Sequence, residues 1–232
     1  MITPILDLRH IFAGYGDMMV LFDINISLYP HQTLVLFGRN GAGKTTLLKT
    51  IAGYIQPKQG EILWNGKNIT KLKPFERSRL GIRYINQEKK IFDSLTVRDA
   101  FNLAKYSYKI TSDNIEEILS YFPKLRQLTN SKIKYLSGGE RQMLNIALGM
   151  LGNPQLLLLD EPMEGLSPAV VNTLISTLKE IKENKKTTIL IAEQSIHIVQ
   201  ELADKVALIA SGKIIDIISR EKLTIEVLTK FI

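Results

Sequence analysis

The sequence predicts an α/β fold with a mainly parallel sheet, and three observations support this prediction. Short apolar runs alternate along the chain with segments whose apolar residues recur at helical spacing. The runs at residues 33–37 and 156–159 are almost wholly apolar, as are strands buried on both faces of a parallel sheet. The first run leads into a glycine-rich loop and the second ends in two carboxylates. Ligand-binding groups gather in this way at the carboxyl ends of parallel strands.

Length and composition favour one domain over residues 1–232. With 232 residues, 45% of them hydrophobic, the chain is long enough for one well-buried α/β domain and short for two. It has no cysteine, so neither disulfides nor thiolate metal ligands are expected. No run approaches about eighteen uninterrupted apolar residues, and no basic segment followed by an apolar one opens the chain. The sequence therefore predicts a cytosolic chain without a membrane span or signal of its own.

Positive charge is concentrated in residues 58–90. The chain carries 30 Lys and Arg against 23 Asp and Glu, and this segment has nine basic residues against three acidic ones, a surplus of six. An anionic partner, either lipid headgroups or nucleic acid, is one interpretation, and an ordinary solvated face is the other. The basic residues are Lys58, Lys67, Lys71, Lys73, Arg77, Arg79, Arg83, Lys89 and Lys90.

The N-terminal segment predicts an antiparallel ribbon. Apolar residues alternate with polar ones over 22–28, the pattern of a strand with one buried face, and residues 5–12 form the expected neighbouring strand. Residues 14–17 between them predict a turn in which Tyr15 is the only aromatic residue. An exposed ring at this turn is suited to stack on a purine. Packing of the ring against the sheet edge is the alternative.

The glycine-rich loop after 33–37 predicts a phosphate-binding site. Its three glycines permit backbone conformations that a Cβ forbids, so that successive N–H groups can approach a polyphosphate. A helix begins near Lys44, and its unpaired N–H groups add a partial positive charge. Lys44 is then placed to reach the β- and γ-phosphates, and the Thr45 hydroxyl to ligate Mg²⁺. The candidate nucleotide-binding residues of the loop are Gly38, Arg39, Asn40, Gly41, Ala42, Gly43, Lys44, Thr45 and Thr46.

The middle of the chain predicts a hairpin, a short strand and a helical region. Asn65-Gly66 between two strand-like runs favours a type I′ turn, which needs positive φ at both central residues. A strand is expected over 82–85, shortly before Gln87. Residues 94–136 predict mostly helices, and Asp113 is the expected cap of one with an apolar stripe.

A second anion-facing helix start is predicted at Ser137-Gly138-Gly139-Glu140. Ser137 and Glu140 form a capping box, and apolar residues cover most of the helix that follows. Two glycines in a first turn are costly, at roughly 1 kcal/mol each relative to Ala in a helix interior. This cost is explained if backbone N–H groups must approach an anion closely.

The carboxylates after 156–159 are candidate metal-binding and catalytic residues. Asp160 can hold the Mg²⁺ shell opposite Thr45, and Glu161 can polarise a water for in-line attack on a γ-phosphate. The exit of a strand to solvent is the alternative explanation of the pair. Beyond them, a helix from Pro168, a buried strand over 187–192 and further strands complete the α/β pattern.

Three motifs in this order and separation resemble the ATP-binding subunit of ABC transporters: the phosphate loop, Leu136-Ser137-Gly138-Gly139-Glu140 and Asp160-Glu161. The resemblance covers essentially the whole chain, and the Ser-Gly-Gly signature is specific to that family. It implies a P-loop NTPase (RecA-like) core with a mainly parallel sheet, an N-terminal antiparallel β ribbon and an inserted α-helical subdomain. The subdomain is expected at about residues 88–139 of a single ABC ATPase domain.

The resemblance also implies roles for single residues. Tyr15 matches the adenine-stacking aromatic residue, and Gln87 matches the glutamine that touches Mg²⁺ and senses the membrane partner. Ser137-Gly138-Gly139 matches the signature that contacts the γ-phosphate of ATP held by the opposite subunit. Asp160 matches the metal-holding carboxylate and Glu161 the catalytic one.

Within the family, the chain is most similar to the ATPase subunit of branched-chain amino-acid importers. Gln194 stands where most ABC ATPases carry a catalytic histidine and these importers commonly carry glutamine; its amide can still donate to a γ-phosphate oxygen. Ser167 stands where many relatives have aspartate. Gln87 departs from the importers, which often have glutamate there. The supporting segments are residues 88–92, 121–125, 161–168 and 192–195.

The resemblance implies ATP and Mg²⁺ as cofactors and two kinds of protein partner. A second ABC ATPase subunit, either another copy or a related chain, is needed because each subunit carries half of each site. An integral-membrane permease must receive the work near Gln87 and 94–136, so the chain is expected to be peripheral at the cytoplasmic face of the membrane. Contact with anionic lipid is an option there, and no nucleic-acid partner is expected.

Two alternatives remain at this stage. A non-transport ABC ATPase acting on ribosomes or DNA would suit the positive charge. Such proteins usually duplicate the domain or insert a long coiled coil, whereas about ninety residues without a heptad run separate loop and signature here. A nucleotide sensor that does not hydrolyse ATP is the other alternative, and the presence of Glu161 argues against it.

Overall fold

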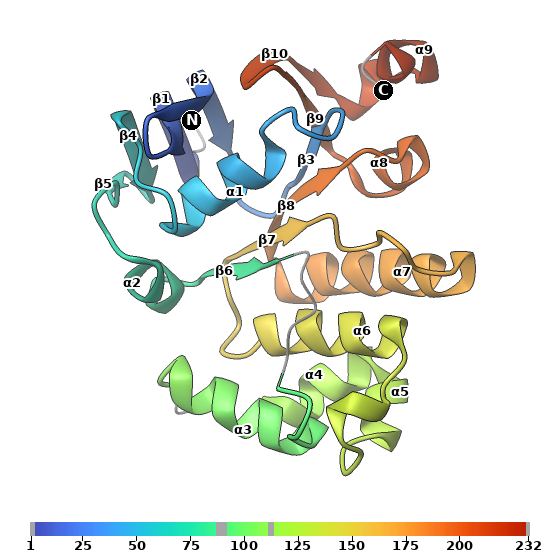
Figure 1. Cartoon of the computed structure of the whole chain (residues 1–232). Helices are drawn as coiled ribbons and strands as arrows, with labels where there is room; N and C mark the ends of the chain where they lie inside the picture. The colour runs from blue at the N-terminus through green and yellow to red at the C-terminus, as the bar shows by residue number, and fades with distance from the viewer. Residues whose placement is uncertain (1–2, 87–91, 111–113, 231–232) are drawn as a thin grey trace.

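The N-terminal part of the chain forms an antiparallel sheet in a computed structural model, which describes residues 3–86, 92–110 and 114–230. The strands follow the order β2-β1-β4-β5 (Figure 1). Asn65 and Gly66 join β4 to β5 with φ angles of 48° and 76°, as the expected type I′ turn requires. The strands are β1 (Leu6–Tyr15), β2 (Met18–Leu28), β4 (Gln59–Trp64) and β5 (Lys67–Asn68).

A second sheet of six strands forms the centre of the molecule, in the order β10-β9-β3-β8-β7-β6. Its strands pair in parallel except for β10, which is antiparallel to β9. The strands are β3 (Thr33–Phe37), β6 (Ile82–Ile85), β7 (Leu156–Asp160), β8 (Thr188–Glu193), β9 (Lys205–Ala210) and β10 (Lys213–Ser219). The predicted α/β fold with a mainly parallel sheet and an N-terminal antiparallel ribbon is confirmed.

Helices cover both faces of the central sheet. Figure 1 shows α1 between the two sheets, whereas α6 and α7 lie on the opposite side with α3, α4 and α5 beyond them. The helices are α1 (Lys44–Ala52), α2 (Pro74–Arg79), α3 (Val97–Ser107), α4 (Ile115–Tyr121), α5 (Pro123–Gln127), α6 (Gly138–Gly149), α7 (Pro168–Lys185), α8 (Ile196–Leu202) and α9 (Ile225–Thr229). Two short 3₁₀ turns span η1 (Ile133–Tyr135) and η2 (Arg220–Lys222). In the described ranges, no helix has both the length and the apolar character needed to cross a membrane.

Alternating side chains of the central strands divide the interior into two cores. Leu156 and Leu158 of β7 pack with α1 and the antiparallel sheet, whereas Leu157 and Leu159 pack with the helices on the other face. All five residues of β7 are buried, as expected of a strand covered on both sides. The same alternation places Asp160, at the end of this strand, on the α1 face.

One local prediction is corrected by the structure, and another falls outside the described residues. The first two strands are longer than expected, so that Tyr15 is the last residue of β1 and not part of a four-residue turn. The two strands pair up to Tyr15 and Met18, with shifts in register along the way. Asp113, the expected cap of a helix, lies outside the described residues, and the helix begins at Ile115 after Asn114.

The basic segment 58–90 is not simply a charged surface. Arg77 is fully buried and donates to the carbonyls of Thr50 and Ile51, both in the last turn of α1, at 2.8 Å. Burial lowers the pKa of Arg77 to about 10. Arg83 is also buried, with its guanidinium 4.1 Å from the centre of the Tyr108 ring. These two charges therefore hold the fold together, and Lys89 and Lys90 lie outside the described residues.

Candidate nucleotide-binding site

The loop between β3 and α1 has the backbone of a phosphate cradle. Gly41 and Gly43 have φ angles of 80° and 107°, where residues with a Cβ are strained. A Cβ on Gly43 would also lie 3.0 Å from Leu21 Cδ2. Gly43 is the N-cap of α1, and among the described residues no side chain caps this helix. Its first N–H groups are therefore available to an anion.

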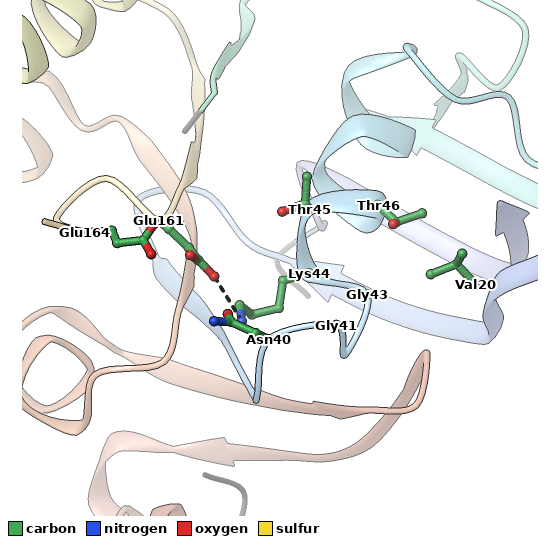
Figure 2. A pocket seen from close by; sticks show the side chains of 9 residues that line it. All are labelled: Val20, Asn40, Gly41, Gly43, Lys44, Thr45, Thr46, Glu161 and Glu164. Carbon is green, nitrogen blue, oxygen red and sulfur yellow. Dashed lines mark ion pairs between the residues drawn. The ribbon is translucent and has the colours of Figure 1, made fainter. Parts of the chain in front are cut away.

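Lys44 is folded back across the loop. Its side chain is 3% exposed, and Nζ donates to the carbonyls of Gly38 at 2.8 Å and Arg39 at 3.1 Å. Nζ also lies 3.1 Å from Glu161 Oε1, the ion pair drawn in Figure 2. The loop lysine and the carboxylate after β7 thus meet at one point.

Each carboxylate oxygen of Asp160 accepts a hydrogen bond from a hydroxyl group. Thr45 Oγ1 donates to Oδ1 at 2.9 Å, and Tyr84 Oη donates to Oδ2 at 2.8 Å. Burial and the neighbouring Asp160 charge raise the pKa of Tyr84, so the phenol is protonated and acts as the donor. Thr45 and Asp160, predicted to lie on opposite sides of Mg²⁺, are hydrogen-bonded directly to each other here. Sequence reasoning missed Tyr84, because its place beside Asp160 depends on the pairing of β6 with β7.

A cavity of about 390 Å³ opens beside the loop. In Figure 2, Glu161 and Glu164 lie on one side of it and Thr46 and Val20 on the other, with Lys44 between. Sequence reasoning did not single out Val20 or Glu164, and neither has a pattern of its own that points to a ligand. The lining residues are Val20, Asn40, Gly41, Gly43, Lys44, Thr45, Thr46, Glu161 and Glu164.

Two other candidate residues line neighbouring cavities. Tyr15 is 45% exposed and shares a cavity of about 570 Å³ with Thr45 and Asp160. Gln194 lines another of about 430 Å³, which also includes Glu161. Both residues are therefore adjacent to the loop site without lining its cavity. Gln87 lies outside the described residues.

Glu193, at the end of β8, is a buried carboxylate beside this site. It is 4% exposed; Oε2 accepts from the Gln194 N–H at 3.2 Å, and Oε1 has no hydrogen-bond partner among the described residues. Burial, reinforced by the charge of Glu161, raises the pKa of Glu193 to about 7. An acidic residue closing an apolar strand was visible in the sequence, but its burial was not.

The Ser-Gly-Gly segment lies apart from the phosphate loop. The expected capping box is present: the Ser137 N–H donates to Glu140 Oε2 at 2.8 Å, and the Glu140 N–H donates to Ser137 Oγ at 3.3 Å. A Cβ on Gly138 would meet nothing within 4 Å, whereas one on Gly139 would lie 2.9 Å from Val170 Cγ1. None of the three signature residues lines the cavity beside the phosphate loop. The chain therefore presents Gly138 on an open surface.

Asp160 and Thr45 fit Mg²⁺. Both offer hard oxygen donors beside the phosphate loop, the ligands that this ion prefers. The described residues contain no group of three or more His, Cys, Asp or Glu that could hold a metal ion. These donors thus suit an ion whose coordination is completed by phosphate and water.

The glycine-rich phosphate loop lies between a parallel strand and a helix, and its threonine is hydrogen-bonded to an aspartate from a nearby strand. Together these features define a P-loop nucleotide-binding protein. The chain belongs to the ABC transporter family, because the sequence profile described as "ABC transporter" matches residues 21–164. It is therefore an ATP-binding ABC ATPase, as the motifs predicted.

Individual relatives agree on the family and differ in the cargo that they name. The chain is 36% identical over 204 residues to "Probable branched-chain amino acid transport ATP-binding protein LivF" of Archaeoglobus fulgidus, covering 87% of this chain and 86% of that one. It is 31% identical over 217 residues to "Spermidine/putrescine import ATP-binding protein PotA" of Legionella pneumophila (strain Paris), covering 92% and 59%. The crystal structure of a nucleotide-free ATP-binding cassette from an ABC transporter superposes with a TM-score of 0.85, at 25% identity and 98% and 96% coverage.

Proposed function

We propose that this ABC ATPase subunit hydrolyses Mg²⁺-bound ATP at the phosphate loop and powers uptake through a separate membrane-spanning permease. The observation that carries the proposal is the meeting of Lys44 with Glu161 and of Thr45 with Asp160 at one loop. Phosphoryl transfer requires positioning and charge compensation more than covalent chemistry. The residues around the loop supply both.

Lys44 and the loop backbone bind the phosphates. In the proposed ATP complex, Nζ exchanges the carbonyls of Gly38 and Arg39 for β- and γ-phosphate oxygens. This exchange is favourable because hydrogen bonds between charged groups are about twice as strong as neutral ones. Tyr15, which is partly exposed, stacks on the adenine.

Thr45 and Asp160 hold the ion, with Gln87 as a further ligand from the segment outside the described residues. Mg²⁺ bound there neutralises negative charge that develops between the β- and γ-phosphates. The Thr45 oxygen would face the ion through a lone pair, and its O–H can go on donating to Asp160. Asp160 keeps its position at the end of the buried strand β7.

Glu161 acts as the general base. Its carboxylate pairs with Lys44 in this structure, and the movement of Lys44 onto the phosphates would end this ion pair before the carboxylate accepts a proton from water. The Gln194 amide donates to a γ-phosphate oxygen from the adjacent cavity. Hydrolysis then leaves separate ADP and phosphate charges.

A second ABC ATPase subunit completes the site. Gly138 is open on the surface at the start of α6, and the signature residues do not reach the cavity of their own chain. We infer that Ser137-Gly138-Gly139 contacts the γ-phosphate of ATP held by the facing subunit, which is a second copy or a related chain. Closure on two ATP molecules and reopening after hydrolysis supply the mechanical work.

The cargo is a branched-chain or other small amino acid in this proposal. The relative named LivF and the segments shared with branched-chain importers support it. The permease contacts the helical subdomain at about residues 88–139, which places the chain at the cytoplasmic face of the membrane, with anionic lipid near its exposed lysines.

Co-purification from membranes tests the partner, and calorimetry tests the site. Tagged wild-type chain should retain integral-membrane subunits through gentle extraction. Lys44→Ala should lose tight ATP binding, whereas Lys71→Ala, an exposed lysine away from the loop, should keep it. Ribosomes or nucleic acid in place of membrane subunits would support the non-transport alternative. Tight ATP binding by Lys44→Ala would contradict the proposed phosphate site.

A further inference from the structure

The Asp160 carboxylate is fixed from two sides, and the proposed function uses only one of them. Thr45 donates to Oδ1 and Tyr84 donates to Oδ2, at 2.9 Å and 2.8 Å. Asp160 itself is 1% exposed. A buried carboxylate with both oxygens hydrogen-bonded has one preferred orientation of its plane.

The sheet register explains why Tyr84 reaches this carboxylate. Tyr84 of β6 pairs in parallel with Leu158 of β7, and Asp160 lies two residues farther along β7. Side chains two residues apart on a strand share a face, so Tyr84 and Asp160 both point toward α1. The length of the phenol spans the diagonal between the two strands, which a shorter hydroxyl side chain would not.

The two hydroxyls have different places in the proposed complex. Thr45 is a proposed ligand of the ion through its hydroxyl oxygen, and its O–H can still donate to Oδ1. Tyr84 is not part of the phosphate loop and can keep its hydrogen bond to Oδ2. In the loaded site the phenol then fixes Oδ2 from outside the phosphate loop, and it helps to set the direction in which Asp160 faces the ion.

We propose that Tyr84 is a positioning residue that orients Asp160 toward the metal ion of the ATP complex. This inference rests on the proposed function, because Asp160 is the metal-holding carboxylate there. Hydrogen-bond partners of metal-binding carboxylates orient them and raise metal affinity. Tyr84 therefore contributes to the affinity that Mg²⁺ adds to nucleotide binding and contributes little to nucleotide binding without metal.

The test compares nucleotide affinity with and without Mg²⁺ in wild type and Tyr84→Phe. A non-hydrolysable ATP analogue is titrated into the full-length chain by calorimetry, once with saturating Mg²⁺ and once with EDTA. The ratio of the two affinities measures what the metal contributes. In Tyr84→Phe this ratio should fall about 10-fold, while affinity in EDTA stays within about twofold of wild type.

Tyr54→Phe is the matched control. The Tyr54 ring lies 5.7 Å from the Tyr84 ring, centroid to centroid, and among the described residues its hydroxyl makes no hydrogen bond to Asp160. It removes the same atom from the same aromatic cluster and should leave the ratio unchanged. Electron paramagnetic resonance of bound Mn²⁺ gives a second readout, since a reoriented carboxylate alters the line shape for Tyr84→Phe alone.

Three outcomes would overturn the proposal or its basis, and they are distinguishable. An unchanged ratio in Tyr84→Phe contradicts the positioning role. An equal fall in Tyr54→Phe assigns the effect to ring packing and contradicts the role of the hydroxyl. A wild-type chain whose nucleotide affinity gains nothing from Mg²⁺ contradicts the metal role of Asp160 itself, and the inference with it. Tyr84→Phe keeps the ring, and an unchanged circular dichroism spectrum verifies its fold.

Discussion

The two glycine-rich helix starts of this chain, at α1 and α6, have opposite surroundings. At α1, Lys44 is buried and bonded to the loop carbonyls and to Glu161, so the chain occupies its own phosphate site with its own charges. At α6, the capping box satisfies Ser137 and Glu140 locally, and Gly138 stays open. Figure 1 shows α1 between the two sheets and α6 on the far face.

This difference fits the proposed function, in which the two motifs contact phosphates at different sites. The α1 end is built to bind ATP within the chain, because its partners converge from β3, β6 and β7. None of the three signature residues lines the cavity beside the phosphate loop, and in the proposed function the α6 end meets an anion held by the facing subunit. We therefore expect changes at the α1 end to affect the isolated chain, and changes at the α6 end to appear only when two subunits meet.

The largest expected effect comes from Glu161→Gln. The change removes the general base while keeping a side chain of the same size, so ATP hydrolysis should fall about 10²–10⁴-fold. ATP affinity should be retained, and the bound form should accumulate as a closed pair of subunits in sedimentation. Phosphate release at the wild-type rate would exclude Glu161 from this role. Glu183→Gln, at an exposed site on α7, serves as the control.

The free energy of unfolding should also depend on pH through Glu193, which is buried near the start of α1. Its folded-state pKa of about 7 exceeds the ordinary 4.5, so between these pH values the folded protein binds more protons than the unfolded chain. The contribution of Glu193 to the free energy of unfolding therefore falls as pH rises through this window, by about 3 kcal/mol, and levels off above pH 7.

Denaturant unfolding across pH 4.5–7.5 measures this effect. Glu193→Gln should gain stability over wild type as pH rises, because the amide carries no charge to bury. Glu183→Gln should follow the wild-type curve. If the free energies of unfolding of wild type and Glu193→Gln changed in parallel with pH, Glu193 would not have the raised pKa on which this prediction rests.

The smallest expected effect is at the rim of the site. Tyr15 is 45% exposed and stacking on a base is worth about 1–3 kcal/mol, so Tyr15→Ala should weaken ATP binding about 10-fold. Tyr15→Phe keeps the ring and should bind normally in calorimetry. If Phe loses as much as Ala, the hydroxyl and not the stacked ring is responsible, and the adenine-stacking role is wrong.

Local motifs were predictable from sequence, and contacts between distant segments were not. The phosphate loop, the Ser137 cap and the carboxylates after 156–159 each depend on neighbouring residues and were expected in place. The bond from Tyr84 to Asp160 depends on how β6 pairs with β7. Arg77 looked like a surface charge because nothing nearby in the sequence shows that it reaches the end of α1.

Gln87 marks another limit of the comparison between sequence and structure. The sequence predicts it as a metal and permease contact, and this stays a prediction because residues 87–91 are outside the described ranges. The longer β1 was also missed, since the Gly14-Tyr15-Gly16 sequence resembles a turn while the backbone keeps strand pairing to Tyr15. Tertiary pairing overrode the local preference in that case.

Trans-complementation tests the central contrast between the two helix starts most directly. Lys44→Ala destroys the phosphate loop and Gly138→Asp places a like charge where the facing γ-phosphate should sit, so each variant alone should be inactive. In a 1:1 mixture of the two, random pairing gives half mixed dimers with one complete site of two, so ATPase activity should recover to about a quarter of wild type. A mixture no more active than its components, with pairing of the two variants demonstrated by sedimentation, would contradict the account.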